Sequence, residues 1–549
     1  MGNVVEFDGE EYFFYYDAAG DFHSVRIQNK PVDLRIANTF DIERSIDLAR
    51  ALLPAYLHSN DFDGRRFLFN TGEEGANSLH FVYVDLDSDV TAFVRSPGTA
   101  LETDRGEGSG QTVGQVVRSQ SVGLLARPLS SVHRLLFLLT NTGVDAVRST
   151  PTPRGSDIEV PALRQGDGMD LQAWETKLDQ LTGTPASRGT IKFMVDGGEY
   201  FPRLIDAMLA EIQSISMRTY VFDNDDYSLK IADILKQRSN EGVKVQLLLD
   251  GLGTIIATKS DPDSLPIGYE APPSVRRYIQ DGSKVNLRQA TNPWMTGDHT
   301  KTTIIGDNTA FIGGMNIGRE YRYEWHDLMM EVSGSVVDVL RKDFEDTWTH
   351  AGAFGDLGYA LKRLTPYRER AEQAQAGFPI RVLHTKAGDS EIFRAQLAAI
   401  RQARRYIYIQ NAYFSDDAIL SELIAARQRG VDVRVIIPLR GNHGPLNKSN
   451  AVAANAMIEN GIRVFIYPGM SHVKAAIYDG WVCLGSANFD KLSFRVNKET
   501  NLATSHSETV DILLERLFLP DMRRSPELTE PFPESFSDHL AELVSDFLL

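Results

Sequence analysis

The pattern of apolar and polar positions changes along the chain. Residues 11–28 and 66–95 alternate apolar and polar side chains between Gly, Asn and Asp, which predicts antiparallel hairpins. Residues 42–53 repeat apolar positions at helical spacing and predict a helix between them. Residues 148–168, rich in Pro, Gly and Asp, predict a linker. We therefore expect an additional N-terminal mixed α+β domain over residues 1–185.

The rest of the chain alternates strands with helical patterns, which is typical of an α/β fold. This pattern occurs twice. In each copy a helix with one apolar face ends at a glycine, Gly242 or Gly430, and an apolar strand follows. An insertion around residues 254–273 lengthens the first copy. Two copies are too few for a solenoid, so we predict a duplicated α/β domain with repeats at 186–360 and 375–549, the second ending in a helical tail.

Each predicted repeat contains a strand that carries a His-x-Lys pair. The pairs are His299 with Lys301 and His472 with Lys474. Because side chains two residues apart on a strand point to the same face, each histidine projects together with its lysine. A single His-x-Lys arises often by chance on a surface strand. Two copies at corresponding places indicate a functional site instead.

These residue types suit the chemistry of a phosphodiester. One imidazole can attack phosphorus while the other protonates the departing alkoxide, and the two lysines can hold phosphate oxygens. A histidine in this role needs a carboxylate that fixes its tautomer. Asp327 and Glu499 stand at nearly equal distances downstream of the two histidines and are the candidates, with ordinary surface acids as the alternative. The candidate phosphate-binding residues are Asn316, Ser486 and Asn488.

Composition and charge narrow the range of partners. A net charge of −17 over 549 residues repels DNA, RNA and anionic lipid surfaces at long range, although a basic pocket can override it locally. The single cysteine, Cys483, excludes an internal disulfide and favours a reducing compartment. No apolar run approaches the roughly 18 residues that cross a bilayer, and the first residues do not resemble a secretory signal. We expect a cytoplasmic protein or one peripheral on the inner membrane, with signal-peptide-independent export as an open alternative.

With its duplicated motif the sequence resembles the phospholipase D superfamily, whose hallmark is a repeated His-x-Lys motif followed, after four residues, by Asp. The resemblance covers about residues 190–525, and His472, Lys474 and Asp479 fit the motif without change. The stretches Gly485–Asp490 and Trp325–Asp327 are similar to the cardiolipin synthase and bacterial phospholipase branch.

This resemblance implies two pseudo-symmetric α/β halves that share one active site. It also implies a covalent phosphohistidine intermediate, resolved by water or by an alcohol, with His299 favoured as the nucleophile and His472 as the acid. No metal and no cofactor is implied. The expected partner is a phospholipid substrate at a membrane surface, with peripheral membrane contact, no nucleic acid and no defined oligomeric state.

The first copy departs from the family pattern at the motif aspartate. Gly306 stands at the motif position, and Asp307 follows one residue later as the candidate replacement. We expect the motif aspartates to hold a strand turn rather than to touch phosphate, so activity should survive the change. Gly306 nevertheless leaves open a catalytically impaired lipid-binding or scaffold protein. A nuclease-type phosphodiesterase is the other alternative, and the acidic charge counts against it.

One apolar pattern lies outside this resemblance. Leucines and a valine recur at helical spacing, with basic residues between them, at Leu125, Leu129, Val132, Leu136 and Leu139. The pattern fits either an amphipathic helix on a membrane surface or a helix packed on the core, which is the commoner case.

Overall fold

The chain is described here from a computed structural model, which covers the strands between residues 4 and 95, residue 127, and residues 129–132, 160–183, 185–251, 253, 271–290, 297–352, 355–364, 376–438 and 444–532. The chain divides into two compact units. The first comprises Met1–Thr112, Asn224–Asp226 and Lys259–Pro273, and the second comprises Val113–Asp223, Tyr227–Thr258 and Ser274–Leu549.

The first unit contains two antiparallel sheets. The strand order of one is β1 (Val4–Phe7), β2 (Glu10–Tyr16), β3 (Phe22–Ile27) and β4 (Lys30–Pro31), and that of the other is β5 (Arg66–Asn70), β6 (Leu79–Asp85) and β7 (Val90–Arg95). Strands β2, β3, β5, β6 and β7 coincide with the stretches for which the sequence predicts hairpins, whereas β1 and β4 lie outside those stretches. The helix predicted over residues 42–53 lies outside the described residues, so the mixed α+β character of this region stays a prediction.

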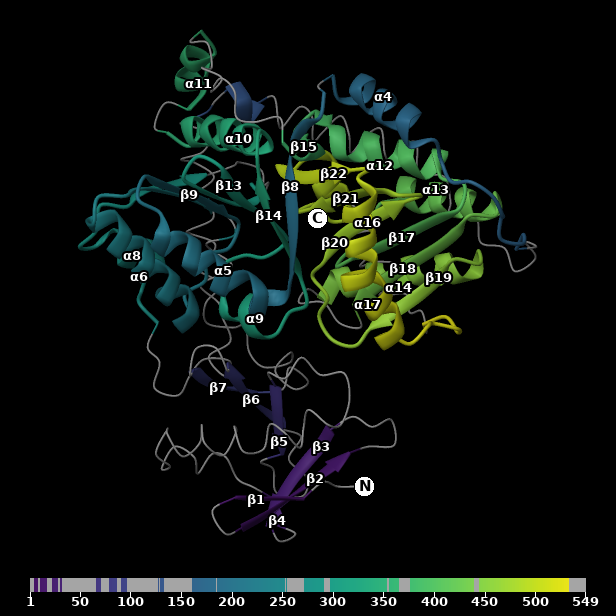
Figure 1. Cartoon of the computed structure of the whole chain (residues 1–549), viewed down its shortest axis with the longest axis horizontal. Helices are drawn as coiled ribbons and strands as arrows, with labels where there is room; N and C mark the ends of the chain where they lie inside the picture. The colour runs from purple at the N-terminus through teal and green to yellow at the C-terminus, as the bar shows by residue number, and fades with distance from the viewer. Residues whose placement is uncertain are drawn as a thin grey trace. The chain divides into compact units, whose positions relative to one another are not determined.

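The second unit is built around one long sheet with helices on both faces (Figure 1). Its first repeat contains β8 (Ser187–Val195), α5 (Asp196–Ala210), β9 (Ser214–Thr219), α6 (Asp226–Asn240), β10 (Lys244–Asp250), α8 (Val275–Gln280), β11 (Asn286–Ala290), β12 (Lys301–Ile305), β13 (Thr309–Gly313), α9 (Arg319–Tyr323), β14 (Leu328–Ser333), α10 (Val336–His350) and α11 (Gly355–Leu364).

The second repeat contains β15 (Phe378–Lys386), β16 (Asp389–Ser390), α12 (Glu391–Gln402), β17 (Tyr406–Asn411), α13 (Asp417–Gln428), β18 (Asp432–Pro438), α14 (Gly444–Glu459), β19 (Arg463–Tyr467), β20 (Lys474–Tyr478), β21 (Trp481–Gly485), α15 (Lys491–Arg495), β22 (Glu499–Thr504), α16 (Ser507–Leu513), a π-helical turn (Leu514–Phe518) and α17 (Leu519–Arg524).

Strand order demonstrates the duplication. From the middle of the sheet outward, the first repeat runs β8-β14-β13-β12-β9-β10-β11 and the second runs β15-β22-β21-β20-β17-β18-β19. Strands β8 and β15 pair antiparallel through Ser187–Gly189 and Phe378–Ile380, which joins the two repeats into one sheet. The predicted helix-ending glycines have left-handed φ angles, 103° at Gly242 and 87° at Gly430, a conformation that glycine adopts without strain. The mixed α/β fold is therefore confirmed, and the matching strand orders agree with the predicted duplication.

One hydrophobic core crosses the boundary between the repeats. It contains apolar side chains of β13, β14 and α10 from the first repeat, and of β20, β21, α16 and the π-helical turn from the second. Such a shared core holds the two repeats in a fixed relation, because separating them would expose its apolar surface to water. This rigidity is a requirement for any site assembled from both repeats.

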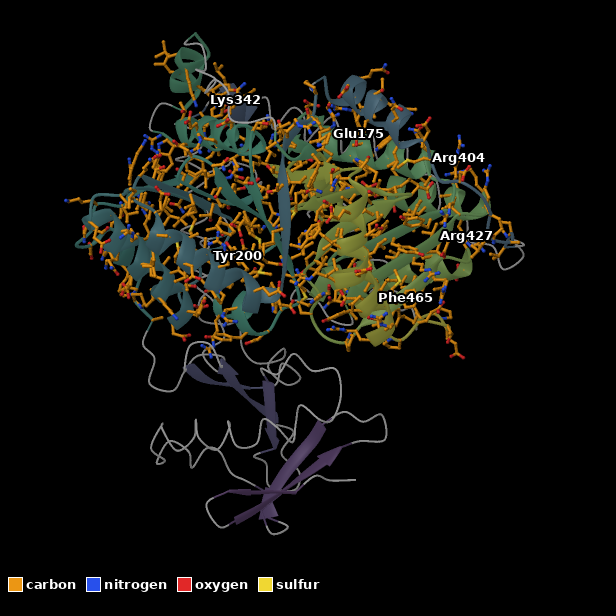
Figure 2. All side chains as sticks on the ribbon, viewed as in Figure 1. Glu175, Tyr200, Lys342, Arg404, Arg427 and Phe465 are labelled. Atoms are coloured by element: carbon orange, nitrogen blue, oxygen red, sulfur yellow. The ribbon has the colours of Figure 1, made fainter. Side chains whose placement is uncertain are left out.

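Helix α4 (Leu171–Thr182) precedes the first repeat in sequence but packs on the core of the second. Trp174 lies edge-on against Trp481, with ring centroids 5.1 Å apart. Arg381 forms an ion pair with Asp179 (2.6 Å), and Glu175, labelled in Figure 2, lies 3.5 Å from the same guanidinium. The domain boundary at residue 185 stays a prediction, whereas α4 itself belongs to the second unit.

In the described part of the apolar pattern around residue 130, the apolar side chains are exposed and the polar ones are buried. Leu129 and Val132 are 77% and 52% exposed, while Arg127 and Ser131 are buried. The side chain of Asp356 accepts the backbone N–H groups of Leu129 and Ser130, at 3.0 and 3.2 Å. These two apolar side chains are therefore not packed on the core.

Candidate active site

The first half of the candidate site combines residues of both repeats. His299 precedes β12, and Glu499 begins β22 of the other repeat. The Nδ1 atom of His299 lies 3.0 and 3.1 Å from the two carboxylate oxygens of Glu499. The backbone N–H of His299 donates to the carbonyl of Lys498 at 2.9 Å, so main chain and side chain are joined at the same place.

The second half repeats this arrangement with the repeats exchanged. His472 precedes β20, and Asp327 precedes β14 of the first repeat. The Nδ1 atom of His472 lies 2.7 Å from Oδ2 of Asp327. Its backbone N–H donates to the carbonyl of His326 at 2.6 Å. The sequence predicts both carboxylates as histidine-orienting residues and does not assign a partner to either. The structure pairs each with the histidine of the opposite repeat.

The two lysines are buried beside the histidines. Each Nζ donates to the backbone carbonyl of the histidine two residues earlier, at 2.7 Å for Lys301. Burial lowers the pKa of Lys301 to about 7, opposed by Glu499 and reinforced by Lys474. Burial also lowers the pKa of Lys474 to about 8, against the attraction of Asp327 and Glu499. An ammonium group so deprived of water gains from any anion that enters the site.

Burial also shifts the pKa values of the two carboxylates and of His299. Burial raises the pKa of Asp327 to about 7 and that of Glu499 to about 8, although the lysines oppose both shifts. Burial and the charges of Lys301 and Lys474 hold the pKa of His299 well below its usual value. His299 is therefore neutral at physiological pH, the state in which an imidazole is a nucleophile.

Ser486 and Gly314 make the two halves unequal. The hydroxyl of Ser486 donates to Oε2 of Glu499 at 2.6 Å and accepts the backbone N–H of Thr500 at 3.0 Å. Gly314 stands at the matching position of the first repeat, where a Cβ atom would lie 2.2 Å from Oδ1 of Asp327. Ser486, a predicted phosphate-binding residue, thus uses its hydroxyl to orient the carboxylate of Glu499.

The two predicted asparagines also differ. Asn316 accepts the backbone N–H of Val221 at 3.0 Å and donates to the hydroxyl of Tyr321 at 2.7 Å, so its amide joins loops of the first repeat. Asn488 is buried, and its Oδ1 has no hydrogen-bond partner among the described residues. Phosphate binding by Asn316, Ser486 and Asn488 stays a prediction.

Three aromatic side chains that are not among the predicted site residues lie beside the histidines. Tyr220 lies edge-on to His299 with ring centroids 4.9 Å apart. Trp325 and Tyr321 lie 5.2 and 5.7 Å from the ring of His472. All three come from the first repeat, so the aromatic wall is asymmetric. Their proximity follows from tertiary structure and has no signature in the spacing of the motifs.

The motif aspartate of the second repeat supports a strand turn. Asp479 lies at the opposite end of β20 from His472 and has a left-handed φ of 49°. Its carboxylate accepts the backbone N–H groups of Arg404, Arg405 and Tyr406 at 2.6, 3.0 and 2.7 Å (Arg404 is labelled in Figure 2). The side chain therefore anchors the start of β17 and does not contact the reacting groups.

In the first repeat a different residue occupies this place. Gly306 has a φ of 56°, and a Cβ atom there would lie 2.4 Å from Oε2 of Glu211. Oε1 of Glu211 accepts the backbone N–H groups of Gln213 and Ser214, the latter at 3.2 Å, where β9 begins. Strand β9 corresponds to β17 in the repeat, so Glu211 supplies the carboxylate that the missing motif aspartate would have supplied. Asp307 lies in the same turn, far from His299, and its carbonyl accepts a hydrogen bond from Arg341 at 3.0 Å.

Among the residues that the structure describes, no three His, Cys, Asp or Glu side chains gather in a way that could hold a metal ion. The helices that the structure describes are all too short or too polar to span a bilayer.

A duplicated α/β fold with paired His-x-Lys strands at the junction of its repeats defines the class of this protein. A family model described as "Cardiolipin synthase, PLD-like domain" matches residues 204–348 and 397–518. The chain belongs to the phospholipase D superfamily, in agreement with the resemblance noted from the sequence.

Relatives and a solved structure extend this comparison. The cardiolipin synthase of Listeria monocytogenes serotype 4a (strain HCC23) is 29% identical over 357 residues, which cover 62% of this chain and 70% of the relative. The cardiolipin synthase of Clostridium perfringens (strain 13) is 28% identical over 364 residues, covering 63% and 73%. The crystal structure of phosphatidylserine synthase from Haemophilus influenzae Rd KW20 is similar in fold, with a TM-score of 0.53 at 14% identity, covering 68% of this chain and all of that one.

Proposed function

We propose that this protein is a phosphatidyltransferase or phospholipase of the phospholipase D type, acting on the head-group phosphodiester of glycerophospholipids. One observation carries the proposal. Two imidazoles at one junction are each held through Nδ1 by a buried carboxylate of the opposite repeat, next to a buried lysine. With Nδ1 engaged, Nε2 is the ring atom that reacts.

In the first proposed step, Nε2 of neutral His299 attacks phosphorus and the bond to the head-group oxygen breaks. His472, protonated on Nε2, gives its proton to the departing alkoxide. The ionised carboxylate of Glu499, 3.0 Å from Nδ1, can accept the Nδ1–H of His299 and stabilise the positive charge that the ring acquires. The products of this step are a free head-group alcohol and a phosphatidyl group bound to His299.

In the second step an acceptor resolves the phosphohistidine. Water or an alcohol loses its proton to Nε2 of His472 and attacks phosphorus, and the P–N bond to His299 breaks. Water gives phosphatidic acid, and an alcohol gives a new phospholipid. The protein returns to its starting protonation state, so no further reagent is consumed.

The lysines favour a phosphate-bearing substrate in this acidic protein. Lys301 and Lys474 have lowered pKa values because burial deprives their charged forms of water. A phosphate oxyanion between them offsets that cost and keeps both ammonium groups charged. The net charge of −17 opposes a long polyanion on the surface, and it does not oppose one phosphodiester inside a buried junction. The two curated relatives are named cardiolipin synthases, which supports a lipid substrate at a membrane surface.

The test uses vesicles of phosphatidylglycerol and of phosphatidylcholine, with single-stranded DNA in parallel. His299→Ala and His472→Ala should each abolish lipid turnover, whereas His506→Ala should retain it as the matched control. His506 lies beyond the far end of β22 and stacks on Phe378, 4.0 Å away between ring centroids. Protein that carries a covalent phosphatidyl group should accumulate in His472→Ala and be absent from His299→Ala.

Two outcomes would reject parts of this proposal. Turnover that persists in both histidine variants would show that the reaction occurs elsewhere. Cleavage of DNA without turnover of lipid would replace the substrate class and keep the site. The impaired alternative predicts no turnover of either substrate, and Glu211 in place of the motif aspartate argues against it.

A further inference from the structure

A third histidine lies behind the candidate site, buried between two carboxylates. His326 has Nδ1 2.8 Å from Oδ1 of Asp196 and Nε2 2.7 Å from Oδ2 of Asp521. Its ring stacks on Tyr467, with centroids 4.7 Å apart and planes 10° from parallel. A neutral imidazole carries one N–H, and an imidazolium carries two. Both contacts are therefore satisfied when His326 is protonated and the two carboxylates are ionised.

His326 and its two carboxylates, here called the clamp, are joined to the second half of the site through the backbone. The carbonyl of His326 accepts the N–H of His472 at 2.6 Å, and the N–H of His326 donates to Met470 at 3.0 Å. Oδ1 of Asp196 also accepts the N–H of Asp327 at 3.1 Å. His326 is thus bonded to the segment that carries His472 and is covalently next to the carboxylate that pairs with it.

Asp196 shows that the arrangement is maintained against a local cost. Its φ of 65° is uncommon for a residue other than glycine. In this conformation its carboxylate reaches both the ring of His326 and the backbone of Asp327. A strained residue that persists where it orients site residues is a candidate for a functional role.

The first half of the site uses different cations at the equivalent place. Lys498 precedes Glu499 as His326 precedes Asp327, and its carbonyl accepts the N–H of His299. Its Nζ lies 2.8 Å from Asp343, which also pairs with Arg218 at 2.8 Å. The cations beside the pair of His299 and Glu499 are thus an ammonium and a guanidinium. The group beside the pair of His472 and Asp327 is an imidazole, whose ordinary pKa lies near 6.5.

We propose that His326 is a positioning residue, whose imidazolium clamps Asp196 and Asp521 together and so holds the pair of Asp327 and His472 in its reactive arrangement. The inference rests on the proposed function for its kinetic test alone. Its direct test is a titration that needs no substrate.

The groups that face His326 keep it charged near neutral pH. They are Asp196 at the start of α5, Asp521 on α17, Tyr467 on β19 and the adjacent Asp327, with Arg524 close to Asp521 (3.6 Å). Burial lowers the pKa of His326, but Asp521, Tyr467 and Asp196 together raise it well above its usual value. The clamp should therefore be complete at neutral pH and lose its charge only in alkaline solution.

The test compares wild type with His326→Gln, Asp521→Asn and the control His506→Gln. Glutamine is neutral, so it cannot replace the cation between the two carboxylates. We expect kcat to fall by about tenfold or more in His326→Gln, as for misplaced catalytic groups, with KM changed by less than about twofold. Asp521→Asn should change kcat in the same direction, and His506→Gln should leave it unchanged.

NMR titration of labelled histidine imidazoles gives the second readout. His326 of wild type should be protonated at pH 7, above the ordinary pKa of an imidazole. Loss of its positive charge should shift the pKa of His472 upward in His326→Gln, because a nearby cation disfavours the charged form of an imidazole. If His326→Gln does not fold, the wild-type titration and Asp521→Asn decide the question. A neutral His326 at pH 7, or variants that match His506→Gln in kcat and in the titration of His472, would overturn the inference.

Discussion

Replacement of the motif aspartate by Gly306 leads to a double-substitution prediction. In the wild type Glu211 holds the backbone at the start of β9, and its Oε2 occupies the space that a Cβ atom at residue 306 would enter. Asp479 does the same work in the second repeat at nearly the same φ angle, 49° against 56°. The two carboxylates are thus alternative solutions to one structural requirement. We predict that Glu211 becomes dispensable once residue 306 is aspartate.

The magnitude follows from the hydrogen bonds that are exchanged. Glu211→Ala removes an ionised acceptor from two backbone N–H groups in a partly exposed loop, which should cost about 1–2 kcal/mol of unfolding free energy. Gly306→Asp places a side chain in a left-handed conformation, at a cost of about 1–2 kcal/mol. The new carboxylate displaces that of Glu211 and takes over its hydrogen bonds. In the Gly306→Asp background, removal of Glu211 should therefore cost close to nothing.

The assay is urea unfolding of wild type, the two single variants and the double variant, followed by tryptophan fluorescence. The expected coupling energy between the two positions is about 1–2 kcal/mol, in the range found for residues in contact. Glu211→Gln is the matched control, since it keeps an acceptor oxygen and should cost less than Glu211→Ala. Equal costs of Glu211→Ala in both backgrounds would refute the substitution of one carboxylate for the other.

Three further predictions follow from the site and the fold. Vanadate binding at pH 7.5 should take up protons, because the anion raises the lowered pKa values of Lys301 and Lys474. Calorimetry in buffers of different ionisation enthalpy measures this, and proton release would contradict it. Trp174→Ala should lower the free energy of unfolding in urea by about 3–5 kcal/mol, whereas Lys177→Ala on the exposed face of α4 should leave it nearly unchanged. A small effect of Trp174→Ala would show that α4 does not contribute to the hydrophobic core of the second repeat. Leu129→Ser should reduce the fraction of protein that co-sediments with vesicles severalfold, at low and high salt alike. An unchanged fraction would exclude this side chain from membrane contact.

The elements of the second unit were predictable because their patterns are local. A helix with an apolar face, a glycine that ends it and an apolar strand recur in both repeats, and each step depends on neighbours in sequence. The same holds for the strands that carry Lys301 and Lys474, whereas the burial of these two lysines is seen only in the structure. The predicted boundary at residue 185 rests on the change of pattern along the chain. A pattern of this kind does not indicate that Trp174 packs against Trp481, which lies far away in the sequence.

The exchange of carboxylates was not predictable from spacing, and the sheet explains it. Strand β13 lies between β12 and β14, and its register places Gly313 opposite both Lys301 and Met329. Strands two apart in a sheet are separated by about 10 Å, and side chains stand roughly perpendicular to the sheet. His299 and Asp327 therefore begin parallel strands at the same edge without facing each other.

Each histidine instead faces the carboxylate of the other repeat. Isolated bridges pair Asp298 with Lys498 and His326 with Ser471, so each histidine is brought to the carboxylate of the other repeat by main-chain contacts. Glu499→Gln should therefore alter the titration of His299 and leave that of His472 in place, and Asp327→Asn should do the reverse. The opposite assignment in an NMR titration would show that the pairs form within each repeat, and neither repeat would then require the other for its histidine.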